Sequence, residues 1–487
     1  MRIVRIGLLT DGRSGLWCDR LVRGIAQHEF EIYAPGRPAP SRVRRRRPGR
    51  GERRAFTGHL SELAGALCGE GGDFAAGLYG LAALARDRGL GLSTALRSEL
   101  AVRTLEAACR TPGARRVAHA ARVPDHLVLA ALLERALRPL SYGWYTEDGL
   151  GAVDLCHAAS GGTTALPGLL AKHFCGVPLL ATEYGVQLRA HYLAASSAPL
   201  SAPVRALYAA FQRLLAAEVY RQAALITPGN AHARRWQEHC GADPAKLRTV
   251  YPGMEADRFT GESGGGDPST LVWAGRIEPA KDLVSLLHAF VAVRDEEPEA
   301  RLRIVVAPVR DPEGAAYLAH CEALAGRLFP CGAAVSFEEA PDPADAYASG
   351  CVVVLSSVVE GFPVGLVESM LCGRATVSTD VGAVVEVVGG TGLVVPPRDP
   401  RALADACLAL LHDPERRERL GAAARARALE LFTVEQSLMA FRGIYLEIVS
   451  HCPVRREVLD ADGGPLLFAT PPEARVPGPI RPEGALR

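Results

Sequence analysis

Two carboxylates eight residues apart, Glu360 and Glu368, enclose a segment with two glycines and a proline that leads into an apolar stretch from Leu366 to Cys372. The apolar stretch has the composition of a helix, and a helix start offers unpaired N–H groups and a positive dipole end to a diphosphate. Glu360 then faces the ligand before the helix, and Glu368, about one turn inside it, can accept hydrogen bonds from a ribose diol. The spacing predicts a sugar-nucleotide site. The plainer alternative is a surface carboxylate and an acid that complements the helix dipole.

A second segment places two cations just beyond a predicted strand. The strand ends at Gly275, Arg276 follows at once, and Lys281 comes five residues later at the start of a predicted helix. Open α/β sheets bind ligands beyond the carboxyl ends of their strands, where Arg276 can grip a phosphate with two N–H groups and Lys281 can act as a point charge. Only three of the 55 basic residues are lysines, and Lys281 is one of them. The alternative is an ordinary pair of solvated cations.

Together the two segments resemble the retaining GT-B glycosyltransferases of family 4, whose donor domain carries a Gly-Arg…Lys motif and a Glu-x7-Glu motif. Here these are Gly275-Arg276…Lys281 and Glu360…Glu368, the latter within the family's Glu-Gly-Phe-Pro context. The resemblance covers about residues 266–450 well. It implies an α/β protein of GT-B architecture, with two Rossmann-like doubly wound domains facing across a cleft. It also implies transfer of a hexose from a nucleoside diphosphate sugar, with a UDP-sugar favoured, to an acceptor hydroxyl with retention.

Within that family the first half is similar to the PelF-like (DUF3492) bacterial transferases, which carry His-Ala-x-Ser-x-Gly and Thr-Glu-His-Gly segments. This chain has His157-Ala-Ala-Ser-Gly-Gly162 and Thr182-Glu-Tyr-Gly185. Tyr184 thus replaces a histidine, and a tyrosine normally keeps its proton at neutral pH. The family's amino-terminal glycine pair is also altered, because the loop from Thr10 to Trp17 has separated glycines. We therefore expect acceptor chemistry to differ here.

The resemblance also implies a role for each matching residue. The catalytic residues would be His157, Arg276, Lys281 and Glu360, and the acceptor side would carry Glu183 and Tyr184. The donor-binding residues would be Gly15, Gly275, Arg276, Lys281, Gly361, Phe362, Pro363, Val364, Gly365, Leu366 and Glu368.

Negative charge on the departing diphosphate would be stabilised by Arg276, Lys281 and the amides around Gly365. Glu360 would hold the sugar hydroxyls and Glu368 the ribose, while His157 would approach the reacting carbon. We expect no cofactor and no catalytic metal. An Asp-x-Asp sequence at Asp460–Asp462 matches a metal motif of other transferases, but it lies in a segment with no predicted strand.

Other functions remain open at this point. A noncatalytic sugar-nucleotide sensor or scaffold subunit of a polysaccharide system is the main alternative, and Tyr184 is the residue that favours it. A GT-B epimerase or phosphorylase is a further one, although those families lack the pairing of Gly-Arg…Lys with Glu-x7-Glu.

Composition limits the partners and the compartment. The 487 residues are 48% hydrophobic and 22% charged, with a formal net charge of +1, which gives no basis for nucleic-acid binding. Twelve cysteines, none in a Cys-x-x-Cys pair, indicate buried thiols in a reducing compartment. With no secretory segment or membrane span predicted, we expect a cytoplasmic bacterial protein. The eight arginines from Arg42 to Arg54 predict a solvated loop or, alternatively, a weak peripheral contact with anionic lipid on the inner face of the membrane or with phosphorylated acceptors.

Alternating strands and helices predict two doubly wound domains. The resemblance implies which domain takes the donor and that a helix crosses between them, and composition predicts the linker and the tail. Residues 1–250 form an acceptor-side Rossmann-like domain with a helical insertion at about 58–140, and 251–267 form a linker. Residues 268–432 form the donor-nucleotide domain, 433–450 a helix that crosses back to the first domain, and 453–487 a disordered tail. The acceptor would be a glycan, a lipid-linked sugar or a small molecule.

Overall fold

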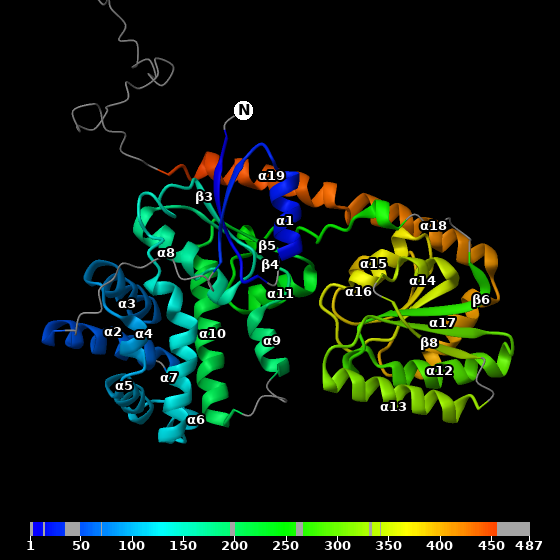
Figure 1. The fold of residues 1–487 in the computed structure, drawn as a ribbon, viewed down its shortest axis with the longest axis horizontal. Coiled ribbons are helices and arrows are strands. Elements are labelled where there is room, and N and C mark those ends of the chain that lie inside the picture. Colours follow the sequence, from blue (N-terminus) through cyan, green and yellow to red (C-terminus); the bar gives the residue numbers. More distant parts are fainter. Residues whose placement is uncertain are drawn as a thin grey trace, which may run out of the picture.

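The computed structural model describes residues 3–12, 15–34, 49–69, 71–194, 200–259, 266–330, 334–340 and 342–454. Within them two separate parallel sheets form, one in each half of the chain (Figure 1). The first has the strand order β2-β1-β3-β4-β5, and the second β11-β10-β9-β6-β7-β8. All recorded strand pairs are parallel. The Asp460–Asp462 motif and most of the predicted tail lie outside the described residues.

The strands are short and mostly buried, as parallel strands covered on both faces require. In the first sheet they are β1 (Arg5–Leu9), β2 (Glu29–Tyr33), β3 (Leu155–Ala158), β4 (Leu179–Glu183) and β5 (Leu225–Pro228). In the second they are β6 (Asp267–Gly275), β7 (Arg301–Val306), β8 (Val335–Glu339), β9 (Gly350–Leu355), β10 (Ala375–Thr379) and β11 (Leu393–Val395). β6 begins within the stretch predicted to be a flexible linker.

Helices connect the strands and cover both sheets. In the first half these are α1 (Gly15–Gly24), α8 (Leu166–Cys175), α9 (Gln187–Ala194), α10 (Ala202–Gln222) and α11 (Ala231–His239). In the second half they are α12 (Leu283–Glu296), α13 (Pro312–Leu328), α14 (Ala344–Ser349), α15 (Val364–Leu371), α16 (Val384–Val388), α17 (Pro400–Leu411), α18 (Pro414–Leu431) and α19 (Val434–His451).

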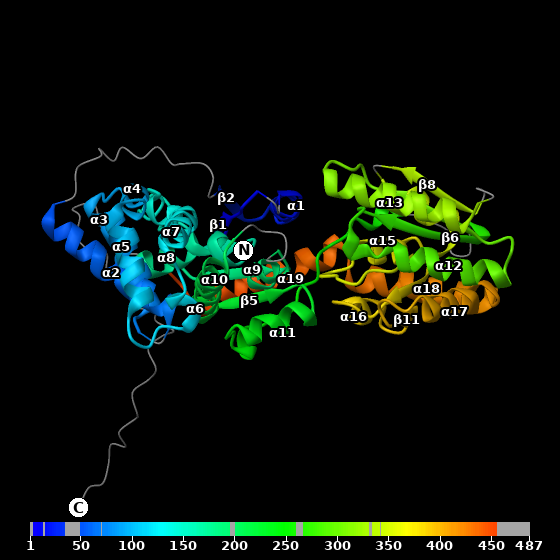
Figure 2. The same ribbon diagram turned by 90° about the horizontal axis from the view of Figure 1, so that it is seen from below.

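A block of helices is inserted between β2 and β3, on the side of the first sheet that lies away from the second (Figure 2). It consists of α2 (Arg50–Cys68), α3 (Phe74–Arg88), α4 (Leu92–Leu96), α5 (Glu99–Arg110), α6 (Arg116–His119) and α7 (Val123–Leu137). Arg50, Arg53 and Arg54 belong to α2, so this part of the predicted arginine loop is helical instead. Residues 42–48 of that loop lie outside the described residues.

Alternate residues of each central strand face opposite helical layers. In β3, Cys156 and Ala158 pack with α8 and α10, whereas Leu155 packs with α1 and α19. The second sheet is layered in the same way, with α12, α13 and α17 on one face and α14, α15, α16 and α18 on the other. This two-residue period decides which side chains of β3 meet the crossing helix α19.

Helix α19 starts in the second half and ends on the first. Its Phe441, Ile444 and Tyr445 are buried against Ile6 and Leu8 of β1, and Figure 1 shows it running from the second sheet across the first. Burial of these large side chains ties the two halves together, because each fully buried one contributes about 1.5–3 kcal/mol.

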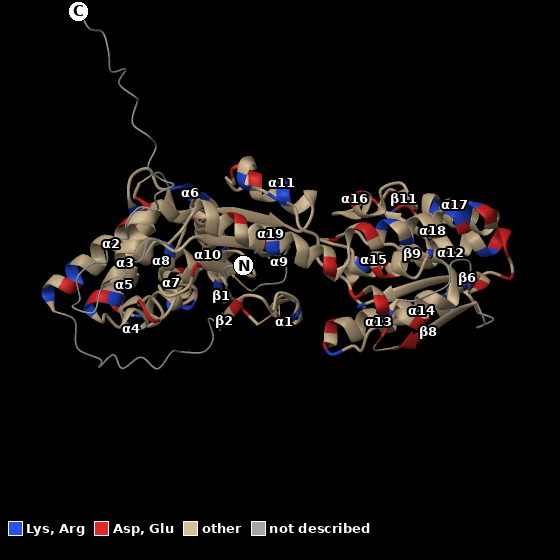
Figure 3. Cartoon of the chain, turned by 90° about the horizontal axis from the view of Figure 1, so that it is seen from above, with Lys and Arg blue, Asp and Glu red and all other residues tan. Residues whose placement is uncertain are grey.

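Surface composition agrees with the balanced charge of the sequence. Acidic and basic side chains are interspersed over both halves (Figure 3). Nine of the eleven cysteines in the described residues are buried as free thiols. In the same residues, none of the helices combines the length and apolar character needed to cross a membrane.

Candidate functional site

Lys281 and Glu360 form an ion pair beyond the carboxyl ends of two neighbouring strands. Lys281 follows β6, Glu360 follows β9, and these strands are adjacent in the sheet. The ammonium contacts the Glu360 carboxylate directly, with side-chain exposures of 16% for Lys281 and 9% for Glu360. The fold thus brings together the two residues that the sequence predicted from separate motifs.

Hydrogen bonds to its own loop hold the Glu360 carboxylate in place. The buried Ser357 hydroxyl donates to Glu360 Oε1 at 2.8 Å. Thr379, at the end of β10, donates in turn to the Ser357 carbonyl at 2.6 Å. The Lys281 loop is tied to the same strand end, because Ser356 donates to the Lys281 carbonyl at 2.8 Å. Two side chains fixed in this way provide a preorganised charge arrangement.

The backbone around Glu360 is enclosed on two further sides. Gly382 has a φ of +58°, and a Cβ there would lie 2.4 Å from the Glu360 carbonyl oxygen, so this close approach requires glycine. From the first half of the chain, Arg189 of α9 donates to the same carbonyl at 3.3 Å. The loop therefore receives a contact from the other half of the molecule.

Arg276 is placed differently from Lys281. Its side chain is 79% exposed and lies 3.7 Å from Glu278, with no contact to Glu360 or Lys281 recorded among the described residues. It shares the sheet edge with the ion pair, because it follows Gly275 at the end of β6. The structure brings Lys281 and Glu360 together and leaves the Arg276 guanidinium in solvent at that edge.

Glu368 lies inside α15 and is bonded to a neighbouring helix. The Tyr347 hydroxyl of α14 donates to Glu368 Oε2 at 3.3 Å. Burial raises the pKa of the Glu368 carboxyl to about 7, and the nearby Arg258 guanidinium opposes this rise only in part. Gly365 lies one turn before it, and a Cβ there would lie 2.8 Å from the same tyrosine oxygen. Glu368 is therefore poised to gain or lose a proton near neutral pH.

The start of α15 is partly occupied by its own turn. The Val364 amide donates to Phe362 O, and those of Leu366 and Val367 donate to Pro363 O. No backbone bond from the Gly365 amide is recorded among the described residues. The Gly361 carbonyl already accepts from Ala383 N at 3.2 Å.

The side chains of three residues predicted to bind the donor pack against the protein. Pro363 and Leu366 are buried, the latter in the core beneath α15. Phe362 is partly buried and packs edge-to-face against Phe432, with the ring centroids 5.9 Å apart. Their side chains therefore support the loop, whereas Val364 is exposed at the helix start.

Two family models match this chain over separate ranges. Residues 268–413 match "Glycosyl transferases group 1", and residues 72–245 match a domain of unknown function, DUF3492. A D-inositol 3-phosphate glycosyltransferase of Kribbella flavida is 32% identical over 297 residues, which cover 56% of this chain and 68% of that protein. The chain belongs to the group 1 glycosyltransferases.

Further relatives of this group 1 glycosyltransferase match over shorter lengths. The D-inositol 3-phosphate glycosyltransferase of Streptomyces bingchenggensis is 32% identical over 46% of this chain and 52% of its own length. The chain thus spans between about half and two thirds of the length of these curated relatives.

The fold has a counterpart among solved structures. The Anabaena protein HepE, in a complex with UDP and glucose, superposes with a TM-score of 0.54 at 14% identity, covering 91% of this chain and all of HepE. The predicted GT-B architecture of two Rossmann-like domains is confirmed.

His157, which was predicted to approach the reacting carbon, is enclosed within the first domain. Its side chain is 0% exposed, with Nδ1 2.7 Å from the Tyr445 hydroxyl and Nε2 2.7 Å from Thr182 Oγ1. Burial lowers its pKa to about 3. The prediction that His157 approaches the reacting carbon disagrees with this structure, because α19 covers it and both ring nitrogens are bonded.

The other predicted first-domain residues divide into buried and open positions. Glu183 is 2% exposed and accepts from the Tyr220 hydroxyl, so its carboxylate lies in the core and not on an acceptor surface. Tyr184 packs over Gly229, where a Cβ would lie 2.5 Å from its ring, and burial raises the pKa of its hydroxyl. Gly15 starts α1 with open space around it.

Several residues at the site were missed by sequence reasoning. The positions of Ser356 and Ser357 in the sequence could have predicted their place at the site, because both follow the β9 strand directly and Ser357 stands three residues before Glu360. No sequence pattern indicates that Arg189 and Tyr347 belong to the site, since they reach it from α9 and α14 through packing alone.

Proposed function

We propose that this chain transfers a hexose from a nucleoside diphosphate sugar, with a UDP-sugar favoured, to an acceptor hydroxyl, with retention and without a metal. The buried Lys281–Glu360 pair at adjoining strand ends is the observation that carries this proposal. The HepE complexes with UDP support the choice of nucleotide by analogy of fold.

In this mechanism Lys281 neutralises charge on the departing diphosphate. The ammonium contacts Glu360, so a bound diphosphate would share this cation, and the Glu360 carboxylate would also accept hydrogen bonds from sugar hydroxyls. Arg276 is 79% exposed at the same edge, near Glu278, and can turn toward the phosphates. Glu368 would hold the ribose, most strongly when it is ionised.

The finer assignments rest on the similarity of residues 72–245 to DUF3492. It supports a relation to PelF-like enzymes and a place in bacterial polysaccharide biosynthesis. We propose a cytoplasmic protein, with a weak contact to the inner face of the membrane through the arginine segment. Because relatives are named for D-inositol 3-phosphate, cyclitol phosphates join glycans and lipid-linked sugars as candidate acceptors.

A noncatalytic sensor or scaffold is the second candidate function. The buried His157, bonded at both ring nitrogens, and the tyrosine at position 184 favour it, because burial raises the pKa of the tyrosine hydroxyl, which therefore keeps its proton at neutral pH. A sensor needs only the donor side of the site.

Release of UDP from a panel of UDP-sugars, with and without acceptors, separates the two functions. Acceptor-stimulated UDP release that persists in EDTA, with the product anomer matching the donor by NMR, supports a retaining and metal-independent transferase. UDP-sugar binding without turnover across the panel supports the sensor, and absence of binding contradicts both.

A further inference from the structure

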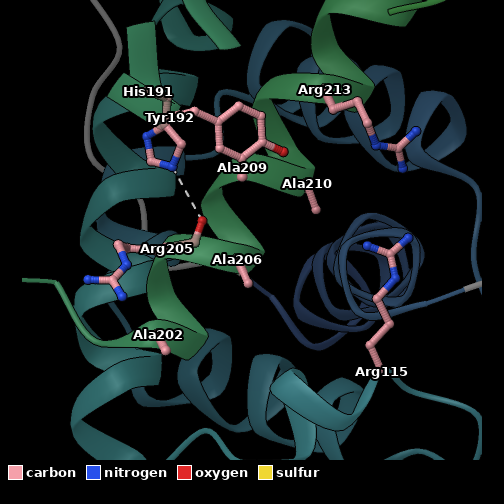
Figure 4. Close-up of a pocket in the computed structure, with 9 residues that line it drawn as sticks. All are labelled: Arg115, His191, Tyr192, Ala202, Arg205, Ala206, Ala209, Ala210 and Arg213. Carbon is pink, nitrogen blue, oxygen red and sulfur yellow. Dashed lines mark hydrogen bonds between the residues drawn. The ribbon is translucent and has the colours of Figure 1, made fainter. Parts of the chain in front are cut away.

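A pocket of about 380 Å³ opens on the first domain between α6, α9 and α10 (Figure 4). Its floor consists of alanines on one face of α10, and its rim carries His191, Tyr192 and three arginines, Arg115, Arg205 and Arg213. This volume falls in the range of about 300–1,000 Å³ typical of small-molecule sites. The pocket shares no lining residue with the Lys281–Glu360 site.

Two of these arginines converge without a counter-charge. Figure 4 shows the guanidinium groups of Arg115 and Arg213 extending toward one another on the same side of the pocket, while that of Arg205 turns the other way. No acidic residue lines the pocket, and neither Arg115 nor Arg213 forms an ion pair within the described part of the chain. By contrast, Arg110 and Arg234 nearby in sequence are each paired with a glutamate.

Two cations that face each other repel unless an anion lies between them. Guanidinium groups donate pairs of N–H bonds that match phosphate oxygens, so a phosphate is the group that would satisfy both arginines at once. The alanine floor adds apolar contact area for the rest of a ligand.

The pocket is connected to the donor loop through α9. His191 Nε2 lies 3.3 Å from the Arg205 carbonyl, which fixes α9 against α10. On the same helix, Arg189 donates to the Glu360 carbonyl. A ligand that contacts Tyr192 therefore touches the helix that also contacts the donor side.

We propose that this pocket binds a ligand bearing phosphate groups, held by Arg115 and Arg213. The phosphate would belong either to a phosphorylated acceptor or to a separate regulatory molecule, and both would bind through the same chemistry. The inference goes beyond the proposed donor site and does not require it.

Calorimetric titration of the full chain with inorganic pyrophosphate, in excess UDP to occupy any donor site, tests the proposal. We expect binding that weakens with salt and that weakens by about tenfold in Arg115→Ala and in Arg213→Ala. The melting temperature should stay unchanged, because both side chains are exposed. The matched control is Arg110→Ala, an exposed arginine outside the pocket.

The proposal would be overturned if the wild type did not bind pyrophosphate. It would also be overturned if the double variant, with Arg115→Ala and Arg213→Ala combined, bound pyrophosphate as tightly as the wild type. Weaker pyrophosphate binding in the arginine variants would identify this pocket as the binding site even if UDP did not bind. Failure of the proposed donor site can therefore be distinguished from failure of this proposal. In a transfer assay, a raised acceptor KM in the double variant with unchanged UDP-sugar hydrolysis identifies the acceptor as the ligand. If pyrophosphate changes kcat and a higher acceptor concentration does not reverse this change, the ligand of the pocket is a separate regulatory molecule.

Discussion

Glu360 in the second domain and His157 in the first come from motifs of the same kind, but the two side chains differ in their exposure and in their bonding partners. Each polar residue lies near the carboxyl end of a buried parallel strand. Glu360 keeps 9% of its side chain exposed and pairs with Lys281, which is 16% exposed, whereas His157 has no exposed surface and is bonded to Tyr445. A strand-end motif thus indicates the edge of the sheet, but access depends on what packs over that edge.

The covering element comes from the far end of the chain. Tyr445 and Phe441 belong to α19, almost 300 residues after His157, and the alternation along β3 turns His157 toward that helix. Four substitutions test this difference between the Glu360 site and the buried His157.

Replacing Lys281 by alanine should abolish most activity. Loss of one preorganised positive charge at the departing diphosphate is expected to lower kcat by about 10²–10³-fold, measured as UDP release at saturating donor. Lys246→Ala, which removes a half-buried lysine of the first domain, is the control. Undiminished turnover in Lys281→Ala would show that the ion pair is not part of the active site.

Replacing His157 by alanine should act on stability. It leaves a cavity and removes the partner of Tyr445 and Thr182, so we expect a loss of about 2–4 kcal/mol in the free energy of unfolding, measured by urea denaturation. The affinity for UDP should stay unchanged. His157→Asn, which keeps a polar side chain, should lose less. A loss of kcat above 100-fold in a stably folded His157→Asn would restore the catalytic role.

Replacing Arg189 by alanine tests the contact between the halves. It removes one hydrogen bond to the Glu360 carbonyl, worth about 0.5–1.5 kcal/mol, so the donor KM should rise by about two- to tenfold in initial-rate measurements. Arg234→Ala, which breaks an ion pair within α11, serves as control and should leave KM unchanged. Equal kinetics for both variants would mean that α9 does not position the loop.

Replacing Glu368 by glutamine should change the pH dependence of UDP affinity. With a pKa of about 7, Glu368 is mostly neutral at pH 6 and mostly ionised at pH 8, so wild-type affinity should rise across this range by several-fold more than that of Glu368→Gln. UDP itself also titrates over this range, but it does so equally with both proteins. The difference between the two pH profiles therefore reports the contribution of the Glu368 carboxyl. Parallel pH profiles by calorimetry would exclude Glu368 from ribose binding.

Much of the second domain could be predicted from the sequence, because several of its strands contain apolar runs, such as residues 351–355, and glycines such as Gly275 mark the turns after strands. The strand β2 was missed although Glu29-Phe-Glu-Ile-Tyr33 alternates polar and apolar residues. Its edge position, with charged side chains, gives a weaker signal than a central strand. Of the predicted donor contacts, Lys281 and Glu360 meet, while Phe362 and Leu366 pack inward.

Local pattern alone was sufficient to place Gly275, Lys281, Glu360 and Glu368 at strand and helix ends, because backbone periodicity and turn residues act over a few positions. Burial of His157, exposure of Arg276 and the contact from Arg189 could not follow from such patterns. They depend on which helix, distant in the chain, covers each face of a sheet, and this is settled only when all the apolar surfaces are buried together.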